Sequence, residues 1–183
     1  CWTLSQQSIP LLVKVFHNLR ILNLSGCYML TEQCFAAISQ HLKKLHTFHV
    51  AFCDGFNSMQ CVRHIASMTQ LVYLDMKMCS NNLVEECIIE LTSKLVNLRY
   101  LNLYRNTSGV TDAVIMSIAR HLKELKVLIV DHCTQITTEG IIAAATKKET
   151  DIIPLFKRLK YLSMIGCPQV HASLCDLNKL VNL

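Results

Sequence analysis

An α/β solenoid, in which short parallel strands alternate with helices, is the fold class that this sequence predicts. A short segment recurs six times at a nearly constant interval, and each copy is followed by residues with helical periodicity. Both features are typical of repeat proteins, in which every unit buries its apolar edge against the next unit. We therefore expect one elongated domain of about six to seven repeats.

The recurring segment carries apolar residues at its first, fourth and sixth places and Cys or Asn at its ninth. Its first copy, LRILNLSGC, runs from Leu19 to Cys27. The interval between copies is nearly constant except for a longer last one, and the copies begin at Leu19, Leu45, Leu71, Leu98, Leu125 and Leu159. From the fourth place onward, apolar residues alternate with others, which predicts a short strand with one buried face.

Helical periodicity follows each strand. Apolar residues spaced by three and four lie on one helical face in three of the units, at Phe35, Ile38, Leu42, Ile88, Leu91, Leu95, Ile115, Ile118 and Leu122. Thr31, Thr111 and Thr137 precede such stretches at places where a hydroxyl can cap the first turn. In the second unit, strict register places His64 on the inner face, although Val62 and Ile65 suit it better. We expect that helix to be rotated or short.

A single domain spanning residues 1–183 accounts for all the repeats. The extra residues of the longest unit lie in the polar stretch 146–154, which ends in Pro and predicts an exposed loop. Cys1 precedes Cys27 by the same interval that separates Leu19 from Leu45, and another unit begins near residue 180. We interpret the chain as a fragment that is cut within repeats at both ends.

Stacked units of a strand and a helix form a horseshoe, with parallel strands on the concave side and helices on the convex side. The pattern is that of a leucine-rich-repeat solenoid. The segments that carry it most clearly are LNLSGCYMLTEQCFAAIS (22–39), LNLYRNTSGVTDAVIMSIARHLKEL (101–125) and LIVDHCTQITTEGIIAAA (128–145).

These segments resemble the cysteine-containing subclass of leucine-rich repeats, as found in the repeat region of F-box/leucine-rich-repeat proteins. The resemblance implies a substrate-receptor subunit of a cullin-type ubiquitin ligase. No segment of the sequence resembles an F-box, so the contact with the ligase adaptor would lie outside this chain. The family often has a second cysteine near the helix end, where this chain has His41, Lys94 and His121.

Composition and charge argue against a membrane-spanning protein and a nucleic-acid-binding protein. Hydrophobic residues make up 51% of the chain, yet no apolar run approaches the ~20 residues of a membrane-spanning helix. The formal charge of +5 comes from 18 basic and 13 acidic residues scattered along the sequence. Because no basic block is present, the sequence does not indicate a nucleic-acid partner.

Ten cysteines raise the question of metal binding or catalysis. The recurring separations between cysteines are longer than the short spacings at which zinc ligands usually pair, as between Cys27 and Cys34. We interpret Cys27, Cys53, Cys79, Cys133 and Cys167 as packing residues at the turn after each strand, the place that Asn106 also occupies. We expect no catalytic, metal or cofactor site, and unpaired thiols indicate a reducing compartment, the cytoplasm or the nucleus.

The outward places of the strands form columns across the horseshoe. The first column holds Ile21, Thr47, Tyr73, Tyr100, Val127 and Tyr161, and the next holds Asn23, His49, Asp75, Asn102, Ile129 and Ser163. Aromatic and Arg side chains concentrate at interface hot spots, although tyrosines also suit exposed strands. We predict a protein-binding surface on the concave face, formed by Tyr73, Tyr100, Tyr104, Lys77, Arg105, Asp75, His49, Phe52, Tyr161 and Ile129.

Three functions are compatible with such a surface. The first is a non-catalytic recognition module, the substrate-binding repeats of an F-box-type receptor. The second is a scaffold, an assembly subunit or an inhibitor that does not belong to a ligase. The third, small-molecule sensing, is the least favoured, because a short array with one sizeable loop offers little to close a pocket.

Overall fold

The computed structural model describes residues 7–53, 58–79, 83–146 and 159–171. Helices and strands alternate along the described chain, as the repeats predict. The helices are α1 (Ser8–Val15), α2 (Glu32–His41), α3 (Met59–Ala66), α4 (Glu85–Lys94), α5 (Asp112–His121) and α6 (Thr138–Thr146). The strands are β1 (Ile21–Asn23), β2 (Thr47–His49), β3 (Tyr73–Asp75), β4 (Tyr100–Asn102), β5 (Val127–Ile129) and β6 (Tyr161–Ser163).

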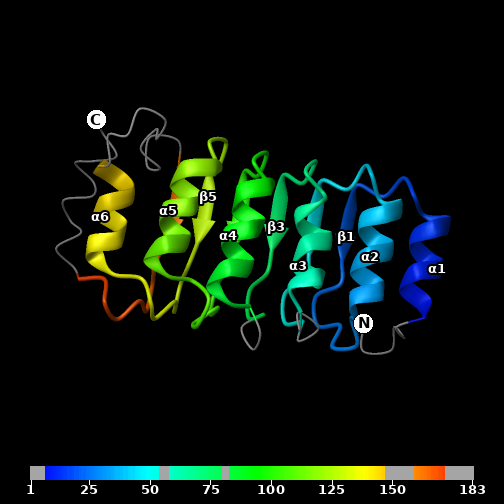
Figure 1. Ribbon diagram of the computed structural model, residues 1–183, viewed down its shortest axis with the longest axis horizontal. Helices are drawn as coiled ribbons and strands as arrows, with labels where there is room; N and C mark the ends of the chain where they lie inside the picture. The colour runs from blue at the N-terminus through cyan, green and yellow to red at the C-terminus, as the bar shows by residue number, and fades with distance from the viewer. Residues whose placement is uncertain (1–6, 54–57, 80–82, 147–158, 172–183) are drawn as a thin grey trace.

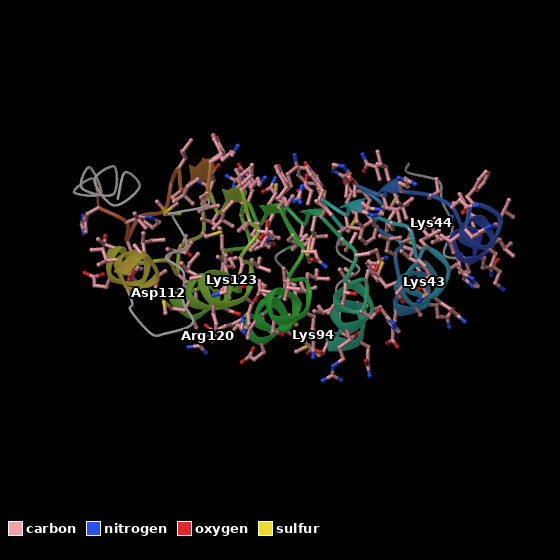
Figure 2. The ribbon with its side chains drawn as sticks, turned by 90° about the horizontal axis from the view of Figure 1, so that it is seen from above. Lys43, Lys44, Lys94, Asp112, Arg120 and Lys123 are labelled. Carbon is pink, nitrogen blue, oxygen red and sulfur yellow. The ribbon has the colours of Figure 1, made fainter. Side chains whose placement is uncertain are left out.

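The six strands form one parallel sheet in chain order, β1-β2-β3-β4-β5-β6. The helices stand side by side along one face of the sheet (Figure 1). Seen from above, the two layers bend into a shallow arc with the helices on its outer side (Figure 2). Since packed helices need about 8–10 Å between axes and strands only about 4.8 Å, the stack curves with its strands inside. The predicted leucine-rich-repeat solenoid is confirmed.

The core lies between the two layers and is continuous from α1 to β6. The inner leucines of the repeat are buried from Leu22 to Leu128, and so are the predicted inner faces of α2, α4 and α5, whereas Leu159 and Leu162 are partly buried. Phe35, Ile38 and Leu42 have no exposed surface at all. Each repeat packs on both neighbours, so the apolar face predicted for each unit becomes one shared core.

Helix α3 departs from the regular repeat in the manner predicted. It has 8 residues, whereas α2, α4 and α5 have 10. Val62 and Ile65 are buried, while His64 is only partly covered. The β-branched side chains of this short helix, rather than the polar imidazole, face the core.

The predicted threonine caps occur at three helix starts, but their hydrogen bonds differ. The hydroxyl oxygen of Thr111 accepts from the Val114 N–H, and that of Thr137 accepts from the Gly140 N–H. Thr31 occupies the cap position of α2, yet its hydroxyl lies 3.6 Å from the Cys34 sulfur and makes no capping bond. Two caps are therefore confirmed in full and the third only in position.

Several predictions on the ends of the chain lie outside the described residues. These are the unit near residue 180, Cys1, and the loop predicted at 146–154 beyond the last residue of α6. The described part contains no helix that is long and apolar enough to cross a membrane.

A ladder of inward side chains joins successive repeats at the turn after each strand. Cys53, Cys79, Cys133 and Cys167 each donate a thiol hydrogen bond to a backbone carbonyl of the preceding repeat, at 3.2, 3.0, 3.4 and 3.2 Å. Their predicted role as buried packing residues with a weak donor is confirmed. The ladder ties the strand ends of adjacent units together.

Asn106 occupies one step of this ladder and makes two bonds to the preceding repeat where a cysteine side chain makes one. Its Nδ2 donates to the Met76 carbonyl at 2.9 Å, and its Oδ1 accepts from the Cys79 N–H at 3.0 Å. The residue is fully buried. Two backbone groups of the preceding repeat thus depend on this single amide.

Replacing Asn106 with Ala should lower the free energy of unfolding by about 2–4 kcal/mol, because two buried backbone groups lose their partner. Asn106→Cys should cost clearly less, since a thiol at this place can still donate to the Met76 carbonyl. Urea denaturation followed by circular dichroism measures both variants. Equal losses would show that packing volume, rather than the amide hydrogen bonds, matters at this position.

Candidate functional site

Strand pairing aligns the outward columns as the repeat predicts. Residue pairing runs Ile21, Thr47, Tyr73, Tyr100, Val127 and Tyr161 across the sheet, and the second column pairs in the same way. The regular repeat therefore places side chains of neighbouring units about 4.8 Å apart on the concave face. Equivalent residues become direct neighbours.

Tyr73 and Tyr100 form an aromatic stack at the centre of the concave face. Their ring centroids are 3.8 Å apart and the ring planes differ by 6°. The His49 ring lies 4.7 Å from Tyr73 and its Nδ1 is 3.8 Å from the Asp75 carboxylate. Side chains from three adjacent strands thus form one contiguous group, which we call the aromatic cluster.

The phenol of Tyr73 is held in its neutral form. Burial raises the pKa of the Tyr73 hydroxyl, and the adjacent Tyr100 hydroxyl and Asp75 carboxylate raise it further. Both tyrosine rings remain only partly covered. The cluster therefore offers a partner flat apolar rings and neutral hydroxyls that can donate or accept hydrogen bonds.

A second group lies where the strands end. The Tyr104 ring meets the His132 ring edge-on at 5.4 Å, and the Arg105 guanidinium lies 5.8 Å from the Tyr104 centroid. In the neighbouring units, Lys77 Nζ lies 5.1 Å from the centre of the Phe52 ring. These contacts hold long side chains against aromatic faces and reduce the entropy lost when a partner binds.

Three of the predicted contact residues lie differently from the rest. Asp75 is only 9% exposed, and its Oδ1 accepts a hydrogen bond from the Lys77 N–H at 3.1 Å. One carboxylate oxygen therefore stabilises the turn after β3. Ile129 is partly covered in the second column. Tyr161 is 54% exposed on β6 and separated from Tyr100 by Val127. The structure thus gathers His49, Tyr73 and Tyr100 and leaves Tyr161 apart.

Some side chains at the outward positions of the strands are less exposed to solvent than the alternating sequence pattern predicts. Asn102 and Ser163 belong to the second outward column, yet both are buried. Asn102 Oδ1 accepts from the Tyr104 N–H at 3.0 Å, and the Ser163 hydroxyl donates to Asp131 at 2.6 Å. Small side chains on a closely spaced sheet are covered by the long side chains beside them, so only large residues reach a partner.

The last outward residue before each Cys or Asn has a left-handed backbone. Its φ is positive in every described repeat, at Gly26, Phe52, Met78, Arg105, His132 and Gly166. The N–H of this residue continues the sheet ladder, as where Arg105 donates to the Asp131 carbonyl at 2.9 Å. At Gly166, an added Cβ would also collide with the His132 ring.

Four non-glycine side chains therefore stand at places that favour glycine, at a cost of roughly 1–2 kcal/mol each. They form a continuous row, the strand-end rim, made of Phe52, Met78, Arg105 and His132. Phe52 and Arg105 belong to the predicted protein-binding surface, and the structure adds Met78 and His132 beside them. The sequence indicates this left-handed backbone through Gly26 and Gly166, which occupy the equivalent places in the first and last described repeats.

The buried thiols are poor candidates for chemistry. Burial raises the pKa of Cys133 to about 12, and burial also raises the pKa of Cys87 and of Cys167. A raised pKa keeps the thiol protonated, whereas a nucleophile or metal ligand must lose its proton. Among the described residues, no group of three or more His, Cys, Asp or Glu side chains is arranged to hold a metal ion.

These features define a leucine-rich-repeat solenoid with an aromatic concave face. No model of a known family matches the sequence, and no curated protein matches it. Among solved structures, a chain of the yeast Rad7–Elc1 complex is similar, with a TM-score of 0.54 and 16% identity over 93% of this chain. The match covers 56% of that chain, so this protein spans little more than half of its length.

An internalin from Listeria monocytogenes aligns more loosely, with a TM-score of 0.38 and 12% identity. That alignment covers 91% of this chain and 61% of the internalin.

The ionisation of Cys133 should contribute to alkaline instability. Its thiol titrates near the ordinary value of 9.0 in the unfolded chain but near a pKa of about 12 in the fold. Its contribution to stability is therefore complete below about pH 9 and is lost as the pH rises towards 12.

Cys133→Ala should make the fall in the free energy of unfolding between about pH 9 and 11 shallower than in the unchanged protein. Urea denaturation at several pH values in a reducing buffer measures this slope. Parallel slopes for the two proteins would contradict the assignment.

The left-handed backbone at Arg105 predicts an unusual order of stability. Both Arg105→Gly and Arg105→Ala remove the exposed side chain, but only glycine adopts this conformation without strain. The Gly variant should therefore be more stable than the Ala variant by about 1 kcal/mol, the reverse of the order in an ordinary strand. Chemical denaturation of the pair tests this, and an Ala variant of equal or greater stability would refute it.

Proposed function

We propose that this chain is a protein-recognition module that binds its partner through the concave sheet. The observation that carries the proposal is the aromatic cluster, together with the strand-end rim. A sheet face exposed to water gains nothing from a tyrosine pair, a histidine and a row of large side chains with strained backbones. Strain of this kind persists where it places groups for function.

The chemistry of the surface favours a polypeptide as partner. Tyr and Phe side chains supply large contact areas with few rotatable bonds, and Tyr, Phe and Arg are enriched at protein interfaces. Stacking of Tyr73 on Tyr100 orders both rings before a partner arrives, which lowers the entropic cost of binding. The strands line the inner side of the arc (Figure 2). Neighbouring strands can therefore present these groups to one partner.

The more specific proposal is that the partner is the target of a ubiquitin ligase. It rests on the resemblance of the repeats to F-box/leucine-rich-repeat proteins. A fold shared with a chain of the yeast Rad7–Elc1 complex is compatible with a subunit that works within an assembly. In this role the repeats hold the target and perform no bond chemistry themselves.

A scaffold or inhibitor outside any ligase is the second candidate function. It uses the same concave surface, so the nature of the copurifying proteins distinguishes it from a receptor. A scaffold copurifies with the other subunits of its assembly but not with a cullin adaptor. A receptor copurifies with the adaptor whether or not its concave face is intact.

The double variant Tyr73→Ala/Tyr100→Ala should abolish capture of the target, because it removes the ordered rings. Affinity purification of the intact protein that carries these repeats, followed by mass spectrometry, measures this. Leu11→Ala, which removes an exposed side chain from α1, is the matched control and should retain every partner.

Tyr73→Phe/Tyr100→Phe separates the two properties of the cluster. The rings remain while both hydroxyls are lost, so retained capture assigns the affinity to ring contacts and partial loss assigns a share to hydrogen bonds. Thermal denaturation confirms that each variant is folded. An unchanged set of partners for the alanine variant would refute the concave-face assignment.

A further inference from the structure

Basic side chains gather at one edge of the solenoid, where the helices end and the strands begin. The described segments that link a helix to the next strand carry Arg20, Lys43, Lys44, Arg99, Lys123, Lys126 and Lys160, and a single carboxylate, Glu124. Figure 2 looks onto this edge and shows Lys43, Lys44, Lys94 and Lys123 spread along it from α2 to α5. We call it the basic edge.

Acidic residues gather at the opposite edge. The first turns of the helices contain Glu32, Glu85, Glu86, Asp112 and Glu139. The fold therefore separates charges that are mixed along the sequence. A field of one sign over a continuous edge attracts a partner of the opposite sign.

Helix termini explain part of this separation. Cations near a helix C-terminus and carboxylates near an N-terminus are favourable, and Lys43 Nζ donates to the Ser39 carbonyl at 2.8 Å in the last turns of α2. This effect fades beyond the terminal turn. It gives no reason for the cations that directly precede β4, β5 and β6.

The residues before the strands form the unexplained part of the basic edge. Lys126 N–H donates to the Arg99 carbonyl at 2.9 Å, and Lys160 N–H donates to the Lys126 carbonyl at 2.8 Å. Three cationic residues thus directly precede adjacent strands, whose backbones lie about 4.8 Å apart, and like charges on neighbouring strands repel.

No neutralising partner is present for these three side chains in the described part of the chain. Neither of its two ion pairs involves them, and no other polar interaction of their side chains occurs there. Arg99 and Lys160 are exposed and Lys126 is partly exposed. A row of mutually repelling cations is stabilised when a polyanion lies along it.

We propose that the basic edge binds the phosphodiester backbone of a nucleic acid. Duplex DNA carries one charge per about 1.7 Å of its axis, a line of closely spaced anions that suits a line of closely spaced cations. In the linking segments that the structure describes, Phe16 and Val96 are the exposed large apolar side chains. A protein interface or a membrane surface would need more apolar contact than this edge offers.

The proposal is independent of the concave-face function, because the two surfaces use different residues. It also differs from what the sequence indicated, since the three cations come from three separate repeats and no basic block joins them. Stacking of the repeats creates the row.

Fluorescence anisotropy with a fluorescein-labelled, mixed-sequence DNA duplex of about 25 base pairs tests the proposal between about 50 and 200 mM salt. The unchanged chain should bind with an affinity that falls steeply with salt. Arg99→Gln/Lys126→Gln/Lys160→Gln should weaken binding about tenfold or more at the lowest salt. It should also reduce the slope of log affinity against log salt by about 3, one for each lost phosphate contact.

Two variants serve as controls. Arg99→Lys/Lys126→Arg/Lys160→Arg keeps the three charges and should keep the affinity and the slope. Arg63→Gln removes a cation on α3, away from the edge, and should also leave both unchanged. Circular dichroism confirms that all variants are folded.

Two further probes identify the class of polyanion, poly-L-glutamate and phosphatidylcholine vesicles containing about 30% phosphatidylserine. Weaker binding of both than of the duplex at equal salt supports the assignment to nucleic acid. The proposal is overturned by tighter binding of either probe, by no binding of the duplex, or by an equal loss of affinity in Arg63→Gln.

Discussion

The stacking of each repeat on the next is the interaction on which every other feature of this protein depends. A single strand and helix leave an apolar edge that only another repeat can cover. The inner leucines, the capped helix starts and the ladder of Cys53, Cys79, Asn106, Cys133 and Cys167 all serve this contact. Because each thiol or amide bonds to the preceding repeat, the register between units has no freedom to slip.

Because the register between repeats is fixed, equivalent residues of successive repeats line up on the concave surface. Equivalent residues of adjacent units become neighbours at strand spacing, so Tyr73 stacks on Tyr100 although the two belong to different repeats. At the strand ends the same geometry forces a left-handed backbone, which the chain accepts with Phe52, Met78, Arg105 and His132. A binding surface can therefore evolve on this fold by substitutions at the outward positions of the strands. The core and ladder residues are needed for packing between repeats and stay unchanged.

The two edges of the arc differ for a related reason. Every helix points the same way, so all positive ends of the helix dipoles lie on one edge and all negative ends on the other. A carboxylate near a positive helix end and a lysine near a negative helix end are each slightly favourable. Because the helices repeat along the solenoid, these charges add up to an electrostatic field of opposite sign at each edge. Arg99, Lys126 and Lys160 exceed what helix ends require, which distinguishes the basic edge from simple dipole compensation.

The sequence by itself determined the fold class, the repeat boundaries and the inner faces, because a stacked repeat must place apolar residues at fixed intervals. It also predicted the short α3 from the conflict between His64 and Val62, and the outward columns from alternation. Tertiary structure alone decided which outward residues a partner can reach. Asp75 and Asn102 accept hydrogen bonds from the backbone N–H groups of their own turns, whereas Tyr73 and Tyr100 stack on one another. It alone also produced the basic edge, since residues far apart along the chain become neighbours only through the stacking of separate units, and the sequence alone records no distance between them.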